Sequence, residues 1–264
     1  MAEPTAQDRP AEPANRRSLV GADRVLAVLT ELALRPAGVS LDELARVLGS
    51  PKPTVHRALA ALRRAGFATQ GSRGSYQLGD EFIRLAFSNH EARPDHLRVE
   101  PILAELAQRY GETAHYAVLD GRSVVYRSKV DPVDGAVKLS STIGGRNPAH
   151  STAVGKLLLA YQLPDDDAVL AWVRAADLPA YTEHTLTTGP ALAAELSLTR
   201  GRDYGTDDQE NETGINCLAV PIHLSSPTVP SGAISISALT YRTPLTALIE
   251  DLPAIRAIVE RRRP

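Results

Sequence analysis

The sequence predicts an α+β protein of two domains. The length of 264 residues exceeds that of most single domains. The first third of the chain carries three helical apolar patterns and then a short hairpin pattern, whereas the rest mixes strands with helices. Apolar residues make up 43% and charged residues 23%, as in ordinary globular proteins. We expect a disordered tail over 1–17, a first domain over 18–79, a linker helix over 80–93 and a second domain over 94–264.

Composition argues against several broad classes. No apolar run approaches the roughly 18 residues of a membrane span, and Met1–Asn15 lacks the apolar core of a secretory signal. Cys217 is the only cysteine, so an intrachain disulfide is excluded. The seven histidines show no metal-binding spacing such as HExxH. We therefore expect a cytoplasmic protein with no metal, no cofactor and no membrane partner.

The first domain is expected to begin with three helices, each carrying apolar residues at i, i+3, i+4 and i+7. Ser40 and Glu43 have the spacing of a capping box at the start of the second helix. Ser50 is expected to cap the third helix, with Pro51 at its first position, and Gly66 to end it. The three stripes are Val25, Val28, Leu29 and Leu32; Leu41, Leu44, Ala45 and Leu48; and Val55, Ala58, Leu59 and Leu62.

A β-hairpin with a basic tip is expected next, because Phe67–Gln70 and Ser75–Leu78 are short extended runs around a glycine-bounded turn. Only Gly49 and Ser50 separate the second helix from the third, so these helices must cross sharply. That order of elements is typical of a winged helix-turn-helix, whose second helix enters the major groove of DNA.

Charge and helix phase indicate which residues would meet DNA. Residues 16–75 hold ten Lys and Arg against four Asp and Glu, whereas the whole chain has a net charge of −2. A chance imbalance on solvated surfaces is the alternative. We expect Arg57 to read guanine, Lys52 and Arg73 to hold phosphates, and Thr54 to contact either a base edge or a phosphate. The expected DNA-contacting residues are Ser50, Lys52, Thr54, His56, Arg57, Arg64 and Arg73.

The second half alternates between helical and extended patterns. Asp80 is expected to cap the linker helix, and a long helix over about Asp95–Tyr110 should turn Leu97, Ile102, Leu103 and Leu106 inward. The expected strands are His115–Leu119, Ser123–Ser128, Val137–Thr142, Cys217–Leu224 and Gly232–Leu239. The expected later helices lie near Ser151–Tyr161, Asp165–Ala176, Ala191–Arg202 and Leu245–Arg263.

Several segments together resemble the IclR family of bacterial transcriptional regulators, over about Ser18–Arg262. The segments are Gly38–Phe67, Tyr76–Gly79, His150–Ala160, Tyr204–Glu210, Gly214–Pro221 and Gly232–Ser237. The resemblance implies a GAF-like effector-binding domain in the second half. It also implies that Asp207 and Cys217 line an effector pocket.

The residues themselves offer further candidates for that pocket. The loop Ile143–His150 leads into Ser151 and Thr152 at a helix start, which suits an anion, although either hydroxyl could simply cap the helix. The acidic run around Asp207 could equally be a solvated surface. The expected effector-binding residues are Thr142, Gly144, His150, Ser151, Asp207, Cys217, Ser235 and Ser237. No arginine is assigned the role of binding a carboxylate group of the effector, although Arg146 lies in the loop Ile143–His150.

The resulting expectation is a DNA-binding transcriptional regulator, a repressor in preference to an activator, whose operator binding responds to a small organic acid or aromatic metabolite. Its partners would be double-stranded operator DNA, the effector, and further copies in a homodimer or dimer of dimers. One alternative is a constitutive DNA-binding protein with a purely structural dimerisation domain. A hydrolytic enzyme is a remote alternative, because no GxSxG motif is present and Gly155-Lys156 lacks the earlier glycine of a phosphate loop.

Overall fold

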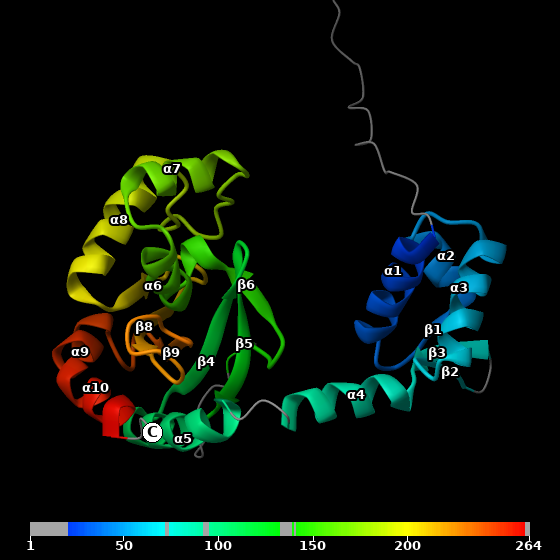
Figure 1. Cartoon of the computed structure of the whole chain (residues 1–264), viewed down its shortest axis with the longest axis horizontal. Coiled ribbons are helices and arrows are strands. Elements are labelled where there is room, and N and C mark those ends of the chain that lie inside the picture. The colour runs from blue at the N-terminus through cyan, green and yellow to red at the C-terminus, as the bar shows by residue number, and fades with distance from the viewer. Residues whose placement is uncertain (1–20, 72–73, 92–94, 133–138, 140, 262–264) are drawn as a thin grey trace, which may run out of the picture. The chain divides into compact units, whose positions relative to one another are not determined.

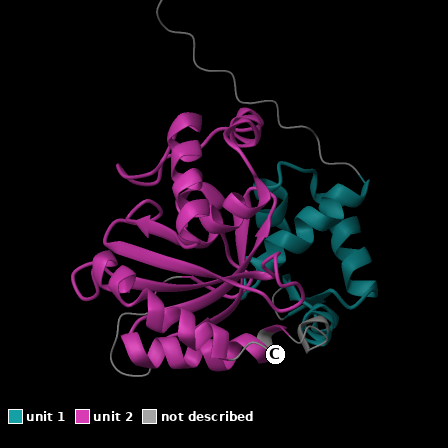
Figure 2. Cartoon of the chain, turned by 60° about the vertical axis from the view of Figure 1, so that its left-hand side comes forward, with its two compact units in different colours: residues 1–93 teal, residues 94–264 magenta. Residues whose placement is uncertain are grey.

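The computed structural model describes residues 21–71, 74–91, 95–132, 139 and 141–261. It divides into two compact units, residues 1–93 and 94–264 (Figure 2). The expected disordered tail lies outside the described residues.

The first unit is a helical domain with a small sheet (Figure 1). The strands pair antiparallel in the order β1-β3-β2, with Ala68 opposite Leu78 in the hairpin. The two-residue strand β1, which the sequence did not predict, pairs Val39 with Tyr76. The elements are α1 Gly21–Ala33, β1 Val39–Ser40, α2 Leu41–Val47, α3 Lys52–Arg64, β2 Ala68–Gln70, β3 Ser75–Leu78 and α4 Asp80–Glu91.

The apolar stripes of the three helices form one core, as their spacing predicted. Val28, Leu44, Val55 and Leu59 are each at most 1% exposed, and the outer members of the stripes pack against them. Burial of such side chains contributes roughly 1.5–3 kcal/mol each. Because the inward side of α3 is committed to this core, its opposite side faces away from the domain.

The starts of α2 and α3 differ. Ser40 Oγ accepts a hydrogen bond from the backbone N–H of Glu43 at 3.2 Å, which is half of the expected capping box. The cap expected at Ser50 is wrong: Pro51 occupies the N-cap position of α3 with no side-chain hydrogen bond. The Ser50 hydroxyl instead donates to the carbonyl oxygen of Leu48 at 3.3 Å, a local bond that competes with capping.

The second unit is built on a six-stranded antiparallel sheet in the order β6-β5-β4-β9-β8-β7. Helices cover both faces of this sheet (Figure 1). The strands are β4 Thr113–Asp120, β5 Ser123–Val130, β6 Arg146–Pro148, β7 Gly205–Asp208, β8 Ile215–Ile222 and β9 Gly232–Leu239. The helices are α5 Asp95–Tyr110, α6 Ala153–Gln162, α7 Asp166–Arg174, α8 Gly189–Arg202, α9 Leu245–Glu250 and α10 Leu252–Arg261, with a 3₁₀ turn over Ala149–Ser151.

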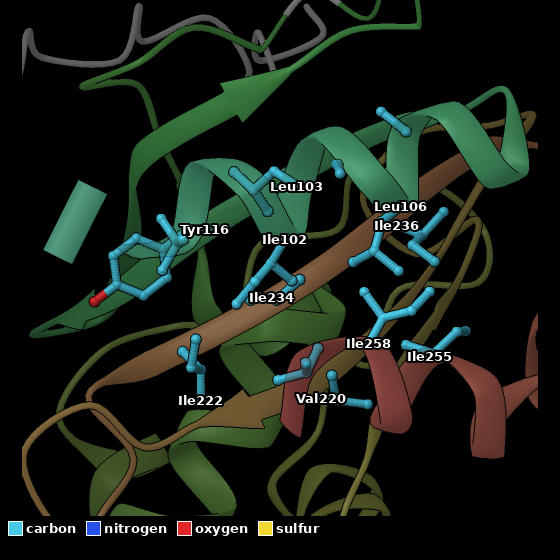
Figure 3. Packing of buried hydrophobic residues seen from close by; sticks show 14 of the residues in the cluster. Ile102, Leu103, Leu106, Tyr116, Val220, Ile222, Ile234, Ile236, Ile255 and Ile258 are labelled. Carbon is cyan, nitrogen blue, oxygen red and sulfur yellow. The ribbon is translucent and has the colours of Figure 1, made fainter. Parts of the chain in front are cut away.

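The sheet separates two apolar clusters. Figure 3 shows the first, in which Ile102 and Leu106 of α5 and Ile258 of α10 meet Ile234 and Ile236 of β9. The second cluster packs α6 and α8 against the other face and includes neither of these isoleucines. Because side chains alternate along a strand, Ser235 and Ser237 lie on the α6 face.

Three expectations about the second unit are wrong. Of the expected strand Val137–Thr142, the described residues Leu139, Ser141 and Thr142 lie in no strand. The outer strand is instead β6, in a stretch expected to be a loop, and its Arg-Asn-Pro sequence has little β-propensity. Leu97, expected to point inward, is 63% exposed. The buried stripe of α5 begins at Val99, and two residues along a helix turn a side chain to the opposite side.

The single helix expected near Leu245–Arg263 is also divided into two helices. α9 ends at Glu250 and α10 begins at Leu252, so Pro253 stands in the first turn of the new helix, where its missing N–H costs nothing.

Candidate functional site

The first candidate site is the outward face of α3. His56, Arg57 and Arg64 are exposed and Thr54 is half-buried, whereas Val55 beside them is fully buried. No hydrogen bond or ion pair within the described residues engages the side chains of His56, Arg57 and Arg64. Free guanidinium groups on a rigid helix suit contact with phosphates and base edges.

The remaining residues expected at DNA are less free or not described. Lys52 Nζ lies 2.8 Å from Asp42 Oδ1, and both side chains are more than half exposed. Ser50 is half-buried and bonded to Leu48. Arg73 lies outside the described residues. Arg63, which was not among the candidates, donates to Gln70 Oε1 at 2.8 Å and so ties α3 to the hairpin.

The second candidate site is a cavity of about 230 Å³ in the second unit. It lies on the α6 face of the sheet and is lined by all six strands or their flanking loops and by the start of α6. Five of the expected effector-binding residues line it: Thr142, Asp207, Cys217, Ser235 and Ser237. A volume below the 300–1,000 Å³ of drug-sized pockets indicates a compact ligand.

Three expected residues do not line the cavity. Gly144 lies in an exposed turn with a φ of 82°, which favours glycine. The His150 ring is buried, and its Nε2 lies 3.1 Å from the carbonyl oxygen of Pro179. Ser151 Oγ donates to Asn211 Oδ1 at 3.2 Å, so it supports a cavity wall from behind.

Several polar lining residues were missed from the sequence. Three of them, His115, Tyr126 and Asn147, lie on strands, where the side that a residue faces depends on register; His115 of β4, for example, stands opposite Ser235 of β9. The others lie in loops. The polar residues missed are His115, Tyr126, Ser141, Asn147, Asn211 and Glu212. The only signal was the isolated His115 between the apolar residues Ala114 and Tyr116, which marks one face of a strand.

The start of α6 closes one side of the cavity. Thr152 Oγ1 accepts the Gly155 N–H at 3.2 Å and donates to the Pro148 carbonyl at 3.0 Å, so this hydroxyl caps the helix and also lines the cavity. A Cβ at Gly155 would lie 2.2 Å from the Ala149 carbonyl oxygen. Glycine is therefore required for the helix to pack this closely against the preceding turn.

A chain of hydrogen bonds crosses the floor of the cavity. Cys217 Sγ donates to Ser237 Oγ at 3.1 Å, Ser237 Oγ lies 3.3 Å from His115 Nδ1, and His115 Nε2 lies 2.8 Å from Ser141 Oγ. Burial, aided by nearby Lys129, lowers the pKa of His115 to about 3. The imidazole is thus neutral near pH 7. Burial also raises the pKa of the Cys217 thiol, which stays protonated.

Asp207 is a buried carboxyl in the cavity wall, only 2% exposed. Its Oδ1 accepts the backbone N–H groups of Glu210 at 2.7 Å and Asn211 at 3.4 Å. Burial raises its pKa to about 7, outweighing those two bonds, which favour the ionised form. The neighbouring Asp208 is exposed, so the solvated-surface interpretation of the acidic run fits Asp208 and not Asp207.

Behind Asp207 lies a buried ion-pair network. Lys156, 1% exposed, contacts Glu210 Oε1, and its Nζ lies 3.4 Å from Glu195 Oε1. Arg202 also pairs with Glu195, at 2.8 Å. Burial raises the pKa of Glu210 while Lys156 opposes that rise. The network compensates its own charges and offers no free cation to the cavity.

Arg146 is the only cation among the described residues that line the cavity. Its side chain is 56% exposed and is paired with Asp120. Arg146 is therefore a solvated charge at the rim of the cavity. It is not a buried cation placed to bind a ligand carboxylate.

No helix in the described part of the chain is long and apolar enough to cross a membrane. Within the same ranges, no group of three or more His, Cys, Asp and Glu side chains is arranged to hold a metal ion.

Models of two protein families match the chain. The IclR helix-turn-helix domain matches residues 21–72, and the Bacterial transcriptional regulator IclR C-terminal domain matches residues 96–261. Among curated relatives, the Escherichia coli HTH-type transcriptional regulator XynR is 31% identical over 221 residues, covering 83% of this chain and 86% of that protein. The Escherichia coli Transcriptional repressor IclR is 34% identical over 231 residues, covering 86% and 81%.

Solved structures share the fold over most of the chain. A transcriptional regulator from a Rhodococcus species superposes with a TM-score of 0.75 at 29% identity, covering 90% of this chain and 94% of that one. An IclR homolog from Microbacterium hydrocarbonoxydans, crystallised with 4-hydroxybenzoate, gives a TM-score of 0.77 at 23% identity, with 90% and 97% covered.

Proposed function

Because the chain belongs to the IclR family of bacterial transcriptional regulators, we propose that a small molecule bound in the cavity of its second unit controls how tightly its first unit holds operator DNA. The chain is a DNA-binding transcriptional regulator. One observation carries the proposed control: the same chain combines an exposed cationic face on α3, where Arg57 and Arg64 have no partner among the described residues, with a cavity lined by buried polar groups.

We assign the DNA contacts to α3 and the hairpin. Arg57 reads guanine through its planar fork, because it is exposed and unpaired within the described residues. Lys52 holds a phosphate after exchanging its contact with Asp42. Thr54 contacts a base edge or a phosphate. The flanking contacts are assigned to Ser50, His56, Arg64 and Arg73.

We assign effector binding to the cavity, with a compact organic acid or aromatic metabolite as the ligand class. The direct contacts are given to Thr142, Asp207, Cys217, Ser235 and Ser237, which line it. Ser151 supports the wall through Asn211. Gly144 and His150, which do not line the cavity, are no longer proposed as contacts.

The assembly follows from the way helix-turn-helix proteins read DNA. Two copies would place their α3 helices in half-sites about 34 Å apart, so we propose a homodimer or a dimer of dimers. We propose repression as its mode of action and the cytoplasm as its site, since relatives are named repressors and operator DNA lies in that compartment.

A constitutive DNA-binding protein with a purely structural second unit is the alternative. The cavity argues against it. The Ser235 hydroxyl faces the cavity from a residue 3% exposed and has no hydrogen-bond partner among the described residues. A hydroxyl that faces a cavity and makes no bond within the protein can both donate to and accept from a bound ligand. A purely structural domain would have no use for such a group.

Two measurements on the purified chain test this function. Affinity for double-stranded DNA, followed by fluorescence anisotropy, should fall steeply between about 50 and 200 mM salt. A panel of compact carboxylates and aromatic acids should raise the melting temperature, because a ligand that binds only the folded state stabilises it. Salt-insensitive or absent DNA binding would contradict the assignment of α3. A panel without any hit would favour the constitutive alternative.

A further inference from the structure

The cavity combines two features that conflict for an anionic ligand. It carries a carboxyl, Asp207, that is 2% exposed. It also lacks a buried cation among the described lining residues, because Arg146 is a solvated rim charge paired with Asp120. An ionised carboxylate ligand would therefore meet a carboxyl group with nothing positive between them.

The cations near Asp207 are already engaged. On α6, Lys156 contacts Glu210 and Glu195. On α8, Arg202 bonds to Glu195 and to Thr206 Oγ1, both at distances under 3 Å. These groups balance one another, so neither is released for a ligand without leaving a buried carboxylate unpaired.

Other charged and titratable groups also leave Asp207 without a cationic partner. On β5, Lys129 Nζ donates to the carbonyl oxygens of Leu139 and Ser141 at 2.8 Å and lies 3.1 Å from Asp131. His115 of β4 is neutral, as its lowered pKa requires. The remaining titratable groups are Tyr126 of β5, Cys217 of β8, the exposed Asp208 of β7, and the loop residues Glu210 and Glu212.

The cavity does offer neutral hydrogen-bonding groups. The Ser235 hydroxyl has no partner within the described residues. Tyr126 Oη accepts a bond from Asn147 Nδ2 at 3.2 Å, which leaves its own O–H to donate. A protonated Asp207 would add one more donor, since its Oδ1 is occupied as an acceptor by the two backbone N–H groups.

We propose that the cavity binds a compact monocarboxylate only together with one proton, which is shared between the ligand carboxylate and the Asp207 side chain. This inference rests on the proposed effector-binding function of the cavity. Two ionised carboxylates brought together inside the protein repel each other more strongly than they would in water. One shared proton replaces that repulsion with a hydrogen bond, as in paired carboxyl groups elsewhere.

The proton balance fixes the pH dependence. Below pH 7 Asp207 already carries the proton, because burial raises its pKa to about 7, and an ionised ligand binds without exchanging protons with solvent. Above pH 7 the free protein has lost that proton, so binding takes up one proton from solvent. The apparent affinity then falls tenfold per pH unit. We expect about tenfold weaker binding at pH 8 than at pH 6.

Titration calorimetry of the full chain tests this with 4-hydroxybenzoate and pyruvate as probes, at pH 6 and 8 and in buffers of different ionisation enthalpy. At least one acid should bind about tenfold more weakly at pH 8, with uptake of one proton there. The neutral 4-hydroxybenzamide needs no shared proton, so its affinity should not fall at the higher pH.

Two variants separate the role of Asp207 from a general effect of pH. Asp207→Asn keeps an oxygen for the loop N–H groups and places an NH₂ donor where the proton would be, so acid binding should become independent of pH. Asp208→Asn, at the exposed neighbour, should keep the wild-type tenfold change. Circular dichroism establishes that both variants are folded.

The outcomes are distinguishable. Acid binding of equal affinity at pH 6 and 8, or a tenfold pH effect that persists in folded Asp207→Asn, would overturn the shared proton and leave the sensing function standing. Binding of the amide alone would do the same. If neither acids nor amide bind at either pH, both the shared proton and effector binding in this cavity are contradicted.

Discussion

The α3 face of the first unit and the cavity of the second unit use charge in opposite ways. On α3, Arg57 and Arg64 stand in solvent with no ionic partner within the described residues. Around the cavity, Lys156 is 1% exposed and contacts two glutamates, and Asp207 is 2% exposed and forms no ion pair within the described residues. Water stabilises the first set of charges, whereas the protein itself must stabilise or neutralise the second.

This difference has physical consequences. Charges in solvent cost little and are available to a polyanion that brings its own negative potential. Charges in the interior are paired or lose their ionisation, as shown by the shifted pKa values of His115 and Asp207. The first surface is suited to binding many phosphates, and the second to distinguishing the protonation and shape of a small ligand.

Removal of one buried charge should cause the largest loss of stability. Lys156→Met leaves Glu210 and Glu195 buried without their cation, so we expect a loss of about 3–5 kcal/mol in the free energy of unfolding. The matched surface change, Lys52→Met, breaks a contact in which both side chains are more than half exposed. It should change stability by less than about 1 kcal/mol. Urea denaturation measures the free energy of unfolding of both variants. Similar losses in the two would contradict the proposed difference between buried and exposed charges.

The second-largest effect should be a pH dependence of the free energy of unfolding that comes from Asp207. In the unfolded chain this carboxyl ionises near 3.8, and in the folded chain near 7. A raised folded pKa contributes stability that is present below about pH 4 and is lost as pH rises to about 7. Relative to Asp207→Asn, the wild type should lose roughly 2–4 kcal/mol over this window. Urea denaturation at several pH values tests this; parallel curves for the two proteins would mean that folding does not shift the pKa of Asp207.

Substitution of the two α3 cations, Arg57 and Lys52, should affect DNA binding in different ways. Arg57→Ala should cost about 1–3 kcal/mol on the preferred duplex and relax the choice of base at one position. Lys52→Ala should weaken all duplexes alike and lower the salt slope by about one. Anisotropy titrations with an operator selected from random duplexes, and with a scrambled duplex, measure both. Equal losses on both duplexes for both variants would show that Arg57 does not read sequence.

The smallest expected effect concerns the helix caps. Thr152→Ala removes the side-chain cap of α6 at the cavity, and Thr188→Ala removes the corresponding cap of α8, which does not line the cavity. Each should cost about 1 kcal/mol of stability. Only Thr152→Ala should also weaken ligand binding. Calorimetry with the best acid of the panel would contradict a role for Thr152 in the site if both variants bound equally.

The same contrast explains which features were predictable from the sequence. The α3 face follows from local periodicity, because Val55 and Leu59 fix the helix phase and therefore the outward position of Arg57. The cavity depends on strand register, which brings His115, Ser235 and Cys217 together from distant segments. No local pattern contains that register. For this reason the sequence predicts neither His115 at the site nor the short, polar strand β6.

Resemblance to the family filled part of this gap. It implies that Asp207 and Cys217 line the pocket, and both line the cavity. It did not exclude Gly144 and His150, whose positions depend on an exposed turn and on a buried contact with Pro179.

The coupling of the two units is the central claim, and operator affinity measured with and without ligand tests it most directly. An acid that binds the cavity by calorimetry should change the affinity of the wild type for its selected operator by at least about fivefold. Asp207→Ala should hold the operator as tightly as the unliganded wild type and fail to respond. A ligand that fills the cavity while leaving wild-type operator affinity unchanged would contradict the account.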